Sequence, residues 1–424
     1  MTVHPNRTAT LPKGMAEAAS TAERRAAIGL RVMVVAVVVL QRFAVPGLTT
    51  ALSMPIVLGV VIYLASERIL VEDNLRTGLY LLAVGLCCGA TLLSTSHFKD
   101  EWSLKSLLLL LFLYAPFCYR LRRELRHLYR PLLEFYTRIM VAAACVALAQ
   151  WLAQVLGWTY KDPLAVLPGP LLLQTYNTFS PVQYGSSLMK TNAIVFLEPS
   201  FCSQFLALAL ITQLVLGGRR WRLALYAAAI LTTVSGTGIL LLGAGLVVLA
   251  VRRGVPWAVG MLIILVLLGT AVSLTSVGQL LTARSTEAAN PNTSGNARFV
   301  APYAQVSAGL AGDTATLLFG RGPGQSSPET SGIQYFNPEG MEANYPVIPK
   351  MGAEYGLIAA LVFTIFAVVA MTKGTPSPTM SAVMLLFYFA LSGSLLQPAT
   401  VYTAYLFTSM FAAGPAYHEH RRPR

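Results

Sequence analysis

Glu198 stands where an ionisable side chain is costly, near the edge of an apolar run in the segment Phe196-Leu197-Glu198-Pro199-Ser200. Carboxylates close to or inside a membrane are rare, and by default they indicate a functional site. Glu198 could also mark a helix start, since proline favours the first helical turn and a carboxylate favours the positive end of the helix dipole. The two interpretations are compatible.

A small set of cations accompanies this carboxylate in, or at the ends of, two long polar segments. An arginine presents a planar fork of donors that suits phosphate oxygens, so this set could bind an anionic group. The alternative is scattered solvated charge. The cations that we expect on the same side of a membrane are Arg42, Lys99, Lys105, Lys161, Lys190, Arg284, Arg298, Arg321 and Lys350.

Other kinds of chemistry find little support. The glycine-rich stretch Phe319-Gly320-Arg321-Gly322-Pro323-Gly324 lacks the Lys-Ser/Thr ending of a nucleotide-binding loop, so we interpret it as a tight turn that positions Arg321. Of the five histidines, only His97 is expected outside the membrane on the same side as the long polar segments, in a short loop. Hydrolase triads and histidine-ligated zinc are therefore disfavoured, and we predict no metal site.

The composition indicates that these residues belong to a membrane protein. The chain has 424 residues, of which 55% are hydrophobic and 12% charged, whereas soluble domains carry about 25% charged residues. Its apolar runs are of the length that a spanning helix needs, so we predict an all-α, polytopic helical bundle. The net charge of +13 does not indicate nucleic acid binding, because the basic residues lie in short loops between apolar segments.

We predict about twelve transmembrane helices in a single domain over residues 26–416. A disordered tail (1–25) and a short tail (417–424) flank it, and long loops cover 158–192 and 276–350, the second between the ninth and tenth helices. Loops of such length are usually functional or disordered. The expected spans lie near 27–45, 48–66, 77–95, 104–119, 133–157, 193–216, 223–234, 238–251, 255–275, 352–371, 380–396 and 400–416.

The distribution of lysine and arginine predicts the orientation, because short loops rich in these residues stay in the cytoplasm. Both termini are then cytoplasmic, the first apolar run is a retained signal anchor, and both long loops lie outside. Residues 223–251 are interrupted by Ser235-Gly236-Thr237-Gly238. We predict two short helices there, since a single helix would move Arg252 and Arg253 outside. Their turn should face the protein interior, where its polar groups can be satisfied.

In this order and spacing the motifs resemble the O-antigen polymerase and O-antigen ligase family of bacterial membrane glycosyltransferases. The resemblance rests on the Lys190-Thr191-Asn192 and Glu198-Pro199 motifs, the broken helix pair, and a long outer loop that ends at Asn344-Tyr345 and Glu354-Tyr355-Gly356. The family often has arginine where this chain has Gly236 and Lys190, and histidine where it has Ala343. The missing histidine makes ligase activity less favoured and leaves the base open.

The resemblance implies a metal-independent and cofactor-independent inverting transfer of a polyprenyl-pyrophosphate-linked oligosaccharide at the periplasmic face of the inner membrane. Repeat units would be polymerised into exopolysaccharide or O-antigen, with a flippase and a chain-length regulator as possible partners beside the lipid bilayer. Alternatives are a ligase for finished glycan and a transporter of lipid-linked sugars. The implied catalytic residues are Glu198, Arg298 and Arg321, and the implied substrate-binding residues are Lys190, Arg284, Asn344, Tyr345 and Lys350.

Overall fold

The computed structural model describes residues 13–98, 102–174, 176–183, 185–254, 294–326, 345–391 and 395–411, with a few positions between 256 and 260. Helices dominate this part of the chain. Five of them are long and apolar enough to cross a membrane: Asn74–Phe98, Arg123–Val155, Pro199–Leu216, Gly236–Arg253 and Val347–Thr372. Shorter apolar helices cover Ser53–Ser66, Leu104–Cys118 and Pro378–Leu391. The described chain therefore has the character of a helical membrane protein.

The α-helices of the described residues are α1 (Lys13–Val39), α2 (Ser53–Ser66), α3 (Asn74–Phe98), α4 (Leu104–Tyr114), α5 (Tyr129–Val155), α6 (Pro199–Leu216), α7 (Arg220–Thr232), α8 (Gly236–Arg253), α11 (Ser294–Phe299), α12 (Ala301–Gly312), α13 (Thr314–Phe319), α14 (Val347–Thr372), α15 (Pro378–Leu386) and α16 (Pro398–Phe407). Two small antiparallel pairs join β1 (Ala44–Val45) to β2 (Leu48–Ala51) and β3 (Leu70–Glu72) to β4 (Tyr119–Leu121). These pairs are short connections between helices.

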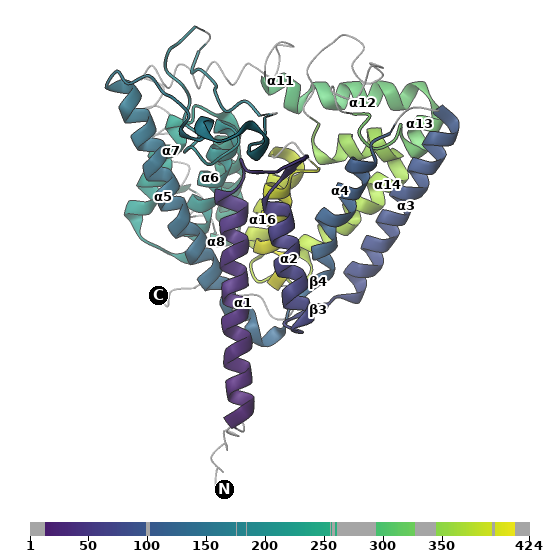
Figure 1. Ribbon diagram of the computed structural model, residues 1–424, viewed down its shortest axis with the longest axis horizontal. Coiled ribbons are helices and arrows are strands. Elements are labelled where there is room, and N and C mark those ends of the chain that lie inside the picture. The colour runs from purple at the N-terminus through teal and green to yellow at the C-terminus, as the bar shows by residue number, and fades with distance from the viewer. Residues whose placement is uncertain are drawn as a thin grey trace.

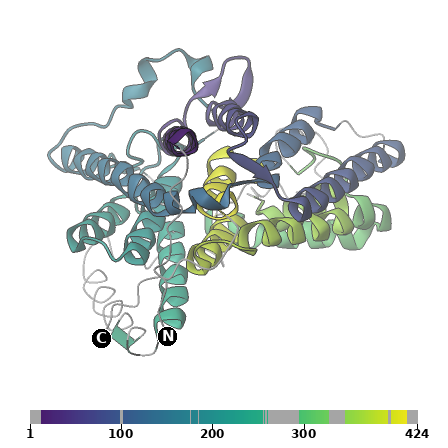
Figure 2. The same cartoon turned by 90° about the horizontal axis from the view of Figure 1, so that it is seen from below.

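Figure 1 shows α11 and α12 lying across one end of the helical bundle, close to where α3 ends and α6 begins. We call this end the cap end. The opposite end carries β3, β4 and the start of α1. Seen from that opposite end in Figure 2, the helices form two groups, one around α5 to α8 and the other around α3 and α14, with α16 between them. The two long polar segments of the sequence, residues 158–192 and the helices α11 to α13, share the cap end.

The first helix begins earlier than the sequence suggested. We expected a disordered tail up to residue 25, whereas α1 starts at Lys13. Residues 13–25 are rich in alanine, glutamate and arginine, which have high helix propensity, so the polar stretch continues the apolar helix. The expected ninth span at 255–275 lies almost wholly outside the described residues, and the tail 417–424 lies outside them entirely.

Helix α6 forms the buried axis of its group. All of its residues except Leu214 are buried, and it packs against α5, α7 and α8. Two glycines of α8 allow the closest approach: a Cβ at Gly238 would lie 2.0 Å from Ser203 Oγ, and one at Gly245 would lie 2.3 Å from Ile211 Cδ1. Small residues at such crossings let helix backbones come together in membranes. Glu198, which directly precedes α6, is therefore attached to a rigid element.

The predicted break is present, although α8 has 18 residues and is longer than the short helix that we expected. Helix α7 ends at Thr232, α8 begins at Gly236, and Val234 between them has a positive φ of 44°. Thr233 and Val234 are buried. The Ser235 carbonyl accepts a hydrogen bond from Ser203 Oγ (3.4 Å). The turn therefore faces the protein interior, as its polar sequence required.

The segment expected as a long loop, 276–350, is partly helical. Its described residues form α11, α12 and α13, and α14 begins at Val347, which puts Lys350 in the first helical turn. Helix α14 is kinked at Gly356, with φ 74° and ψ 173°. The kink leaves the carbonyls of Ala353 and Glu354 available, and they accept hydrogen bonds of 2.9 Å from the amides of Arg321 and Gly322. The glycine-rich turn is thus fastened to α14.

We expect Gly356→Ala to destabilise the protein by about 2–3 kcal/mol, because its backbone conformation is one that essentially only glycine adopts. An added Cβ would also lie 2.3 Å from the Leu318 carbonyl oxygen. Thermal unfolding of the detergent-solubilised protein measures the effect. Gly352→Ala on the same helix is the control, since its Cβ would meet only side-chain atoms at 3.8 Å. Equal unfolding midpoints for the two variants would contradict the role of the kink.

Candidate functional site

Glu198 and Arg298, which are 100 residues apart in the sequence, meet at the cap end. Arg298 Nη2 lies 3.3 Å from Glu198 Oε2, and the side chains are 23% and 18% exposed. Ser200 Oγ donates to the same carboxylate oxygen at 2.9 Å, while the Asn177 amide donates to Oε1 at 3.4 Å. The structure therefore brings together two of the three residues that the sequence predicted as catalytic. Both side chains remain partly accessible.

Glu198 stands at the start of a helix and beside two aromatic rings. It precedes Pro199 at the N-terminus of α6, where the helix dipole stabilises negative charge, although its side chain accepts no hydrogen bond from the α6 backbone. The neighbouring Tyr176 ring contacts Phe201, with centroids 6.3 Å apart. Burial, together with the negative charge of Glu198, raises the pKa of Tyr176 to about 12. Tyr176 therefore stays a neutral phenol beside the carboxylate.

The Lys190-Thr191-Asn192 motif precedes Glu198 in the chain and is bound to two helices. Thr191 and Asn192 are buried. The Thr191 amide donates to the Thr232 carbonyl (3.2 Å) at the end of α7, and the Asn192 amide donates to Gln150 Oε1 (3.3 Å) on α5. The backbone amides of Thr191 and Asn192 thus fix the approach to Glu198. Gln150 gave no signal in the sequence, because an uncharged polar side chain within an apolar run does not stand out.

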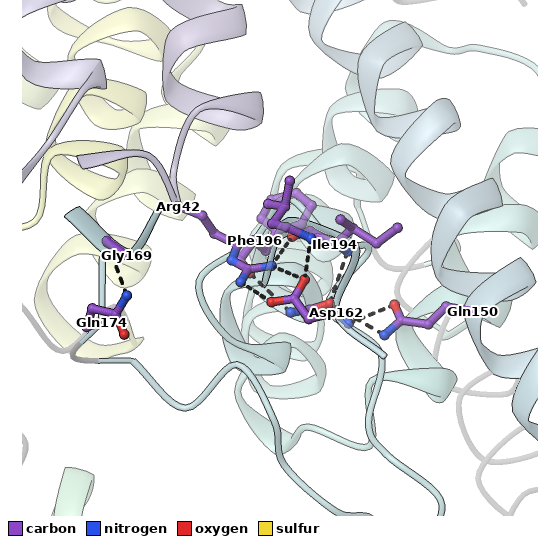
Figure 3. A network of polar contacts seen from close by, with 9 residues as sticks. Arg42, Gln150, Asp162, Gly169, Gln174, Ile194 and Phe196 are labelled. Carbon is purple, nitrogen blue, oxygen red and sulfur yellow. Dashed lines mark hydrogen bonds and ion pairs between the residues drawn. The ribbon is translucent and has the colours of Figure 1, made fainter. Parts of the chain in front are cut away.

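A strained corner connects the motif to Glu198. Ala193 and Ile194 both have positive φ, 49° and 67°. This conformation is rare for residues other than glycine and is an outlier for a β-branched residue. It costs about 1–3 kcal/mol per residue and persists only where the surrounding structure enforces it. The Ile194 carbonyl accepts a 2.8 Å hydrogen bond from Arg42 Nη1, as Figure 3 shows.

Arg42 belongs to a buried ion pair, not to scattered solvated charge. Its Nη1 donates to Asp162 Oδ1 at 2.9 Å, its Nη2 contacts Asp162 Oδ2, and both side chains are 5% exposed. Burial alone would raise the pKa of Asp162. Hydrogen bonds from Arg42 and the Leu164 amide, together with the charge of Arg42, outweigh burial and lower that pKa below its ordinary value. The pair therefore stays ionised at neutral pH.

We expect Asp162→Asn to destabilise the protein by about 3–5 kcal/mol at pH 7, because it leaves a buried guanidinium unpaired. A carboxyl group whose pKa is lowered by folding stabilises the protein above its unfolded pKa of about 3.9 and loses this contribution as the pH falls through its folded pKa. The difference between wild type and variant should therefore shrink below about pH 4.

Thermal unfolding in detergent at pH 7 and pH 3 tests this expectation for Asp162. Glu67→Gln is the matched control, since Glu67 pairs with Arg25 at 36% and 43% exposure and such pairs contribute at most about 1 kcal/mol. An Asp162→Asn protein as stable as wild type at pH 7 would show that the buried pair does not stabilise the fold.

Arg321 is held by a different cluster. Its guanidinium carbon lies 3.8 Å from the centroid of the Phe98 ring at the end of α3, a cation–π contact. Helix α12 separates α11, which carries Arg298, from α13, which Arg321 follows (Figure 1). The described contacts of the two arginines differ: Arg298 contacts Glu198 directly before α6, whereas Arg321 contacts α3 and α14.

Lys350 and Tyr345 also belong to the α14 region. Lys350 Nζ lies 3.4 Å from Oε1 of the fully buried Glu354, and Ser326 Oγ donates to the same oxygen at 2.5 Å. Tyr345 is buried and donates to Gln305 Oε1 of α12 at 2.8 Å, and burial raises the pKa of its phenol to about 12. These contacts fasten α12 and the glycine-rich turn to α14.

Of the three remaining predicted site residues, the structure describes only Lys190. The Lys190 amide donates to the Ser180 carbonyl at 2.8 Å. Arg284 and Asn344 lie outside the described residues. Within the part of the chain that the structure describes, there is no group of three or more His, Cys, Asp or Glu side chains that could hold a metal ion.

No family model, no curated protein and no solved structure matches this chain. The resemblance to the O-antigen polymerase and ligase family therefore stays a prediction from motifs. The geometry at the cap end gives an independent basis for discussing function, because it joins a carboxylate and a guanidinium that are distant in sequence.

Proposed function

We propose that this chain is a membrane glycosyltransferase that polymerises polyprenyl-pyrophosphate-linked oligosaccharide repeat units into exopolysaccharide or O-antigen. The observation that carries the proposal is the contact of Glu198 with Arg298. A carboxylate that can accept a proton and a guanidinium that can bind a diphosphate are the two groups that such a transfer needs. They come from the motif before α6 and from the long loop, the two places that the family resemblance implied.

The proposed orientation puts the cap end in the periplasm. The opposite end, around β4 and the start of α5, carries Arg120, Arg122, Arg123 and Arg126, and Arg252 and Arg253 end α8. Clusters of arginine beside short connections favour the cytoplasmic side of a membrane. With about twelve membrane segments, the short helices α7, α15 and α16 included, both termini are cytoplasmic and Glu198 faces the compartment that holds the translocated donor.

In the proposed reaction Arg298 binds the diphosphate of the donor, where negative charge grows as the glycan leaves. The contact to Glu198 uses one of the five guanidinium donors of Arg298. Glu198 accepts the proton of the acceptor hydroxyl, whose oxygen forms the new bond to the anomeric carbon while the bond from that carbon to the phosphate oxygen breaks. Attack opposite the leaving group inverts the configuration, and polyprenyl diphosphate departs.

The proposal is tested by incubating the purified protein with lipid-linked repeat units in the presence of a chelator. We expect a ladder of products that differ by one repeat unit, because neither step calls on a metal ion. Proteoliposomes that carry the units on one face separate the transport alternative: movement of intact units across the bilayer without a ladder would contradict polymerisation and favour a transporter.

A further inference from the structure

We propose that Arg42 and Asp162 are positioning residues for Glu198: the buried pair holds the strained corner at Ala193–Ile194 and thereby places the carboxylate against Arg298. The kinetic part of this inference rests on the proposed function. Its structural part, that the pair controls the environment of Glu198, does not. Neither residue has a described contact with Glu198 or Arg298, and the corner is where the Arg42 guanidinium contacts the backbone that leads to Glu198.

Three distant parts of the chain meet at this pair. Arg42 follows α1, and its own carbonyl accepts a hydrogen bond from the Leu173 amide (2.9 Å). Asp162 precedes the short helical turn Pro163–Val166 and accepts from the Leu164 amide at 3.1 Å. Both residues are thus fixed by the backbone as well as by each other. Figure 3 shows Arg42 reaching Asp162 and Ile194 with the same guanidinium group.

The corner at Ala193–Ile194 connects the fixed Arg42 side chain to the position of Glu198. Ile194 resists the left-handed conformation, so it needs an external contact to stay there. Arg42 supplies that contact at the Ile194 carbonyl, and Asn192 Oδ1 accepts from the Ile194 amide at 3.0 Å. Both sides of the residue are therefore held. Phe196 and Leu197, which are buried, connect Ile194 to Glu198, so a rotation at the corner would displace the carboxylate.

A double variant, Arg42→Met with Asp162→Leu, removes the hydrogen bond to Ile194 without leaving a buried charge. Replacing a buried ion pair by apolar residues of similar size is often neutral for stability, so the protein should reach wild-type membrane levels. We expect kcat for chain growth to fall at least about tenfold, since small misplacements of a catalytic group are costly. KM for the lipid-linked donor should stay within about threefold, because Arg298 is untouched.

The control double variant is Arg25→Met with Glu67→Leu, an ion pair that is half-exposed and connects α1 to the end of α2. It should leave kcat unchanged. A comparable loss of kcat in the control, or wild-type kcat in the Arg42/Asp162 variant, would overturn the proposal.

Ile194→Gly should rescue the activity of the Arg42/Asp162 double variant. No such rescue is expected if the Arg42–Asp162 pair only stabilises the fold. Glycine adopts positive φ without strain, so Ile194→Gly should recover at least about a third of the lost activity in the Arg42/Asp162 background. In the wild-type background it should change kcat by less than about threefold. A further loss of activity in the triple variant would contradict the role of the corner.

Carbodiimide labelling of Glu198, read by mass spectrometry of the purified protein, does not depend on enzymatic activity. Loosening the contact with Arg298 should raise the labelling rate of Glu198 at least about threefold in the Arg42/Asp162 variant and leave it unchanged in the control. If wild type makes no ladder but the labelling rises, the proposed function fails and the positioning stands. If labelling stays at the wild-type rate, the positioning fails whatever the activity.

Discussion

We expect Arg298→Ala to lower the rate of glycan chain growth by about 10²–10³-fold, the usual loss when one donor to a developing negative charge is removed. The leaving diphosphate gains charge as the glycosidic bond breaks, and a fixed guanidinium stabilises that charge more than it stabilises the bound donor. Arg298 is 23% exposed and Glu198 is 18% exposed. Membrane levels should stay near wild type, since Glu198 keeps its hydrogen bonds from Ser200 and Asn177.

Arg138→Ala is the matched control for Arg298. Arg138 lies on α5 and its side chain is 68% exposed. Its Nη2 lies 4.0 Å from Glu134 Oε2. Its removal should leave the ladder unchanged. The measurement is the rate of ladder formation by purified variants at saturating donor. Wild-type polymer length in Arg298→Ala would remove this residue from the reacting centre.

The second large effect is expected for Glu198→Gln, which keeps the shape of the side chain and removes its ability to accept a proton. General base catalysis contributes about 10²–10⁴-fold, and kcat should fall within that range. Ser200 can still donate to the amide oxygen at position 198, as it does to the carboxylate at 2.9 Å. The helix start should therefore persist.

Single-turnover rates with donor and acceptor in excess measure the effect of Glu198→Gln on the chemical step. Glu198→Asp serves as the comparison, because it keeps a carboxylate but withdraws it by one methylene group, and we expect an intermediate rate. Full activity in Glu198→Gln would show that this carboxylate has no part in the reaction and only a structural role at the start of α6.

Sequence reasoning succeeded where a local signal was strong. The lengths of the apolar runs predicted helices, and polar residues between Thr233 and Gly238 predicted the α7–α8 break that the structure contains. Glu198 was identified because a carboxylate is unusual at the edge of an apolar run. We expected Glu198 and Arg298 to lie close together because of the family resemblance and because both were predicted outside the membrane segments. No sequence pattern indicated the distance between their side chains.

Tertiary contacts without a local signal were missed. Arg42 and Asp162 are 120 residues apart, and neither has neighbours that distinguish a buried ion from a solvated one. The cation–π contact of Arg321 with the ring of Phe98 likewise had no signal in the sequence. The helices α11 to α13 were read as loop because they are short and lack an apolar stripe long enough to predict a span.

Equilibrium binding of polyprenyl diphosphate to the purified protein tests the central claim most directly, because it isolates the contact that the reaction requires. The account predicts that Arg298→Ala binds this lipid at least about tenfold more weakly than wild type, a difference of about 1.4 kcal/mol. Glu198→Gln should bind it at least as tightly as wild type, since the competing carboxylate is gone. Equal affinities in wild type and Arg298→Ala would contradict the assignment of the Glu198–Arg298 pair as a diphosphate-binding centre.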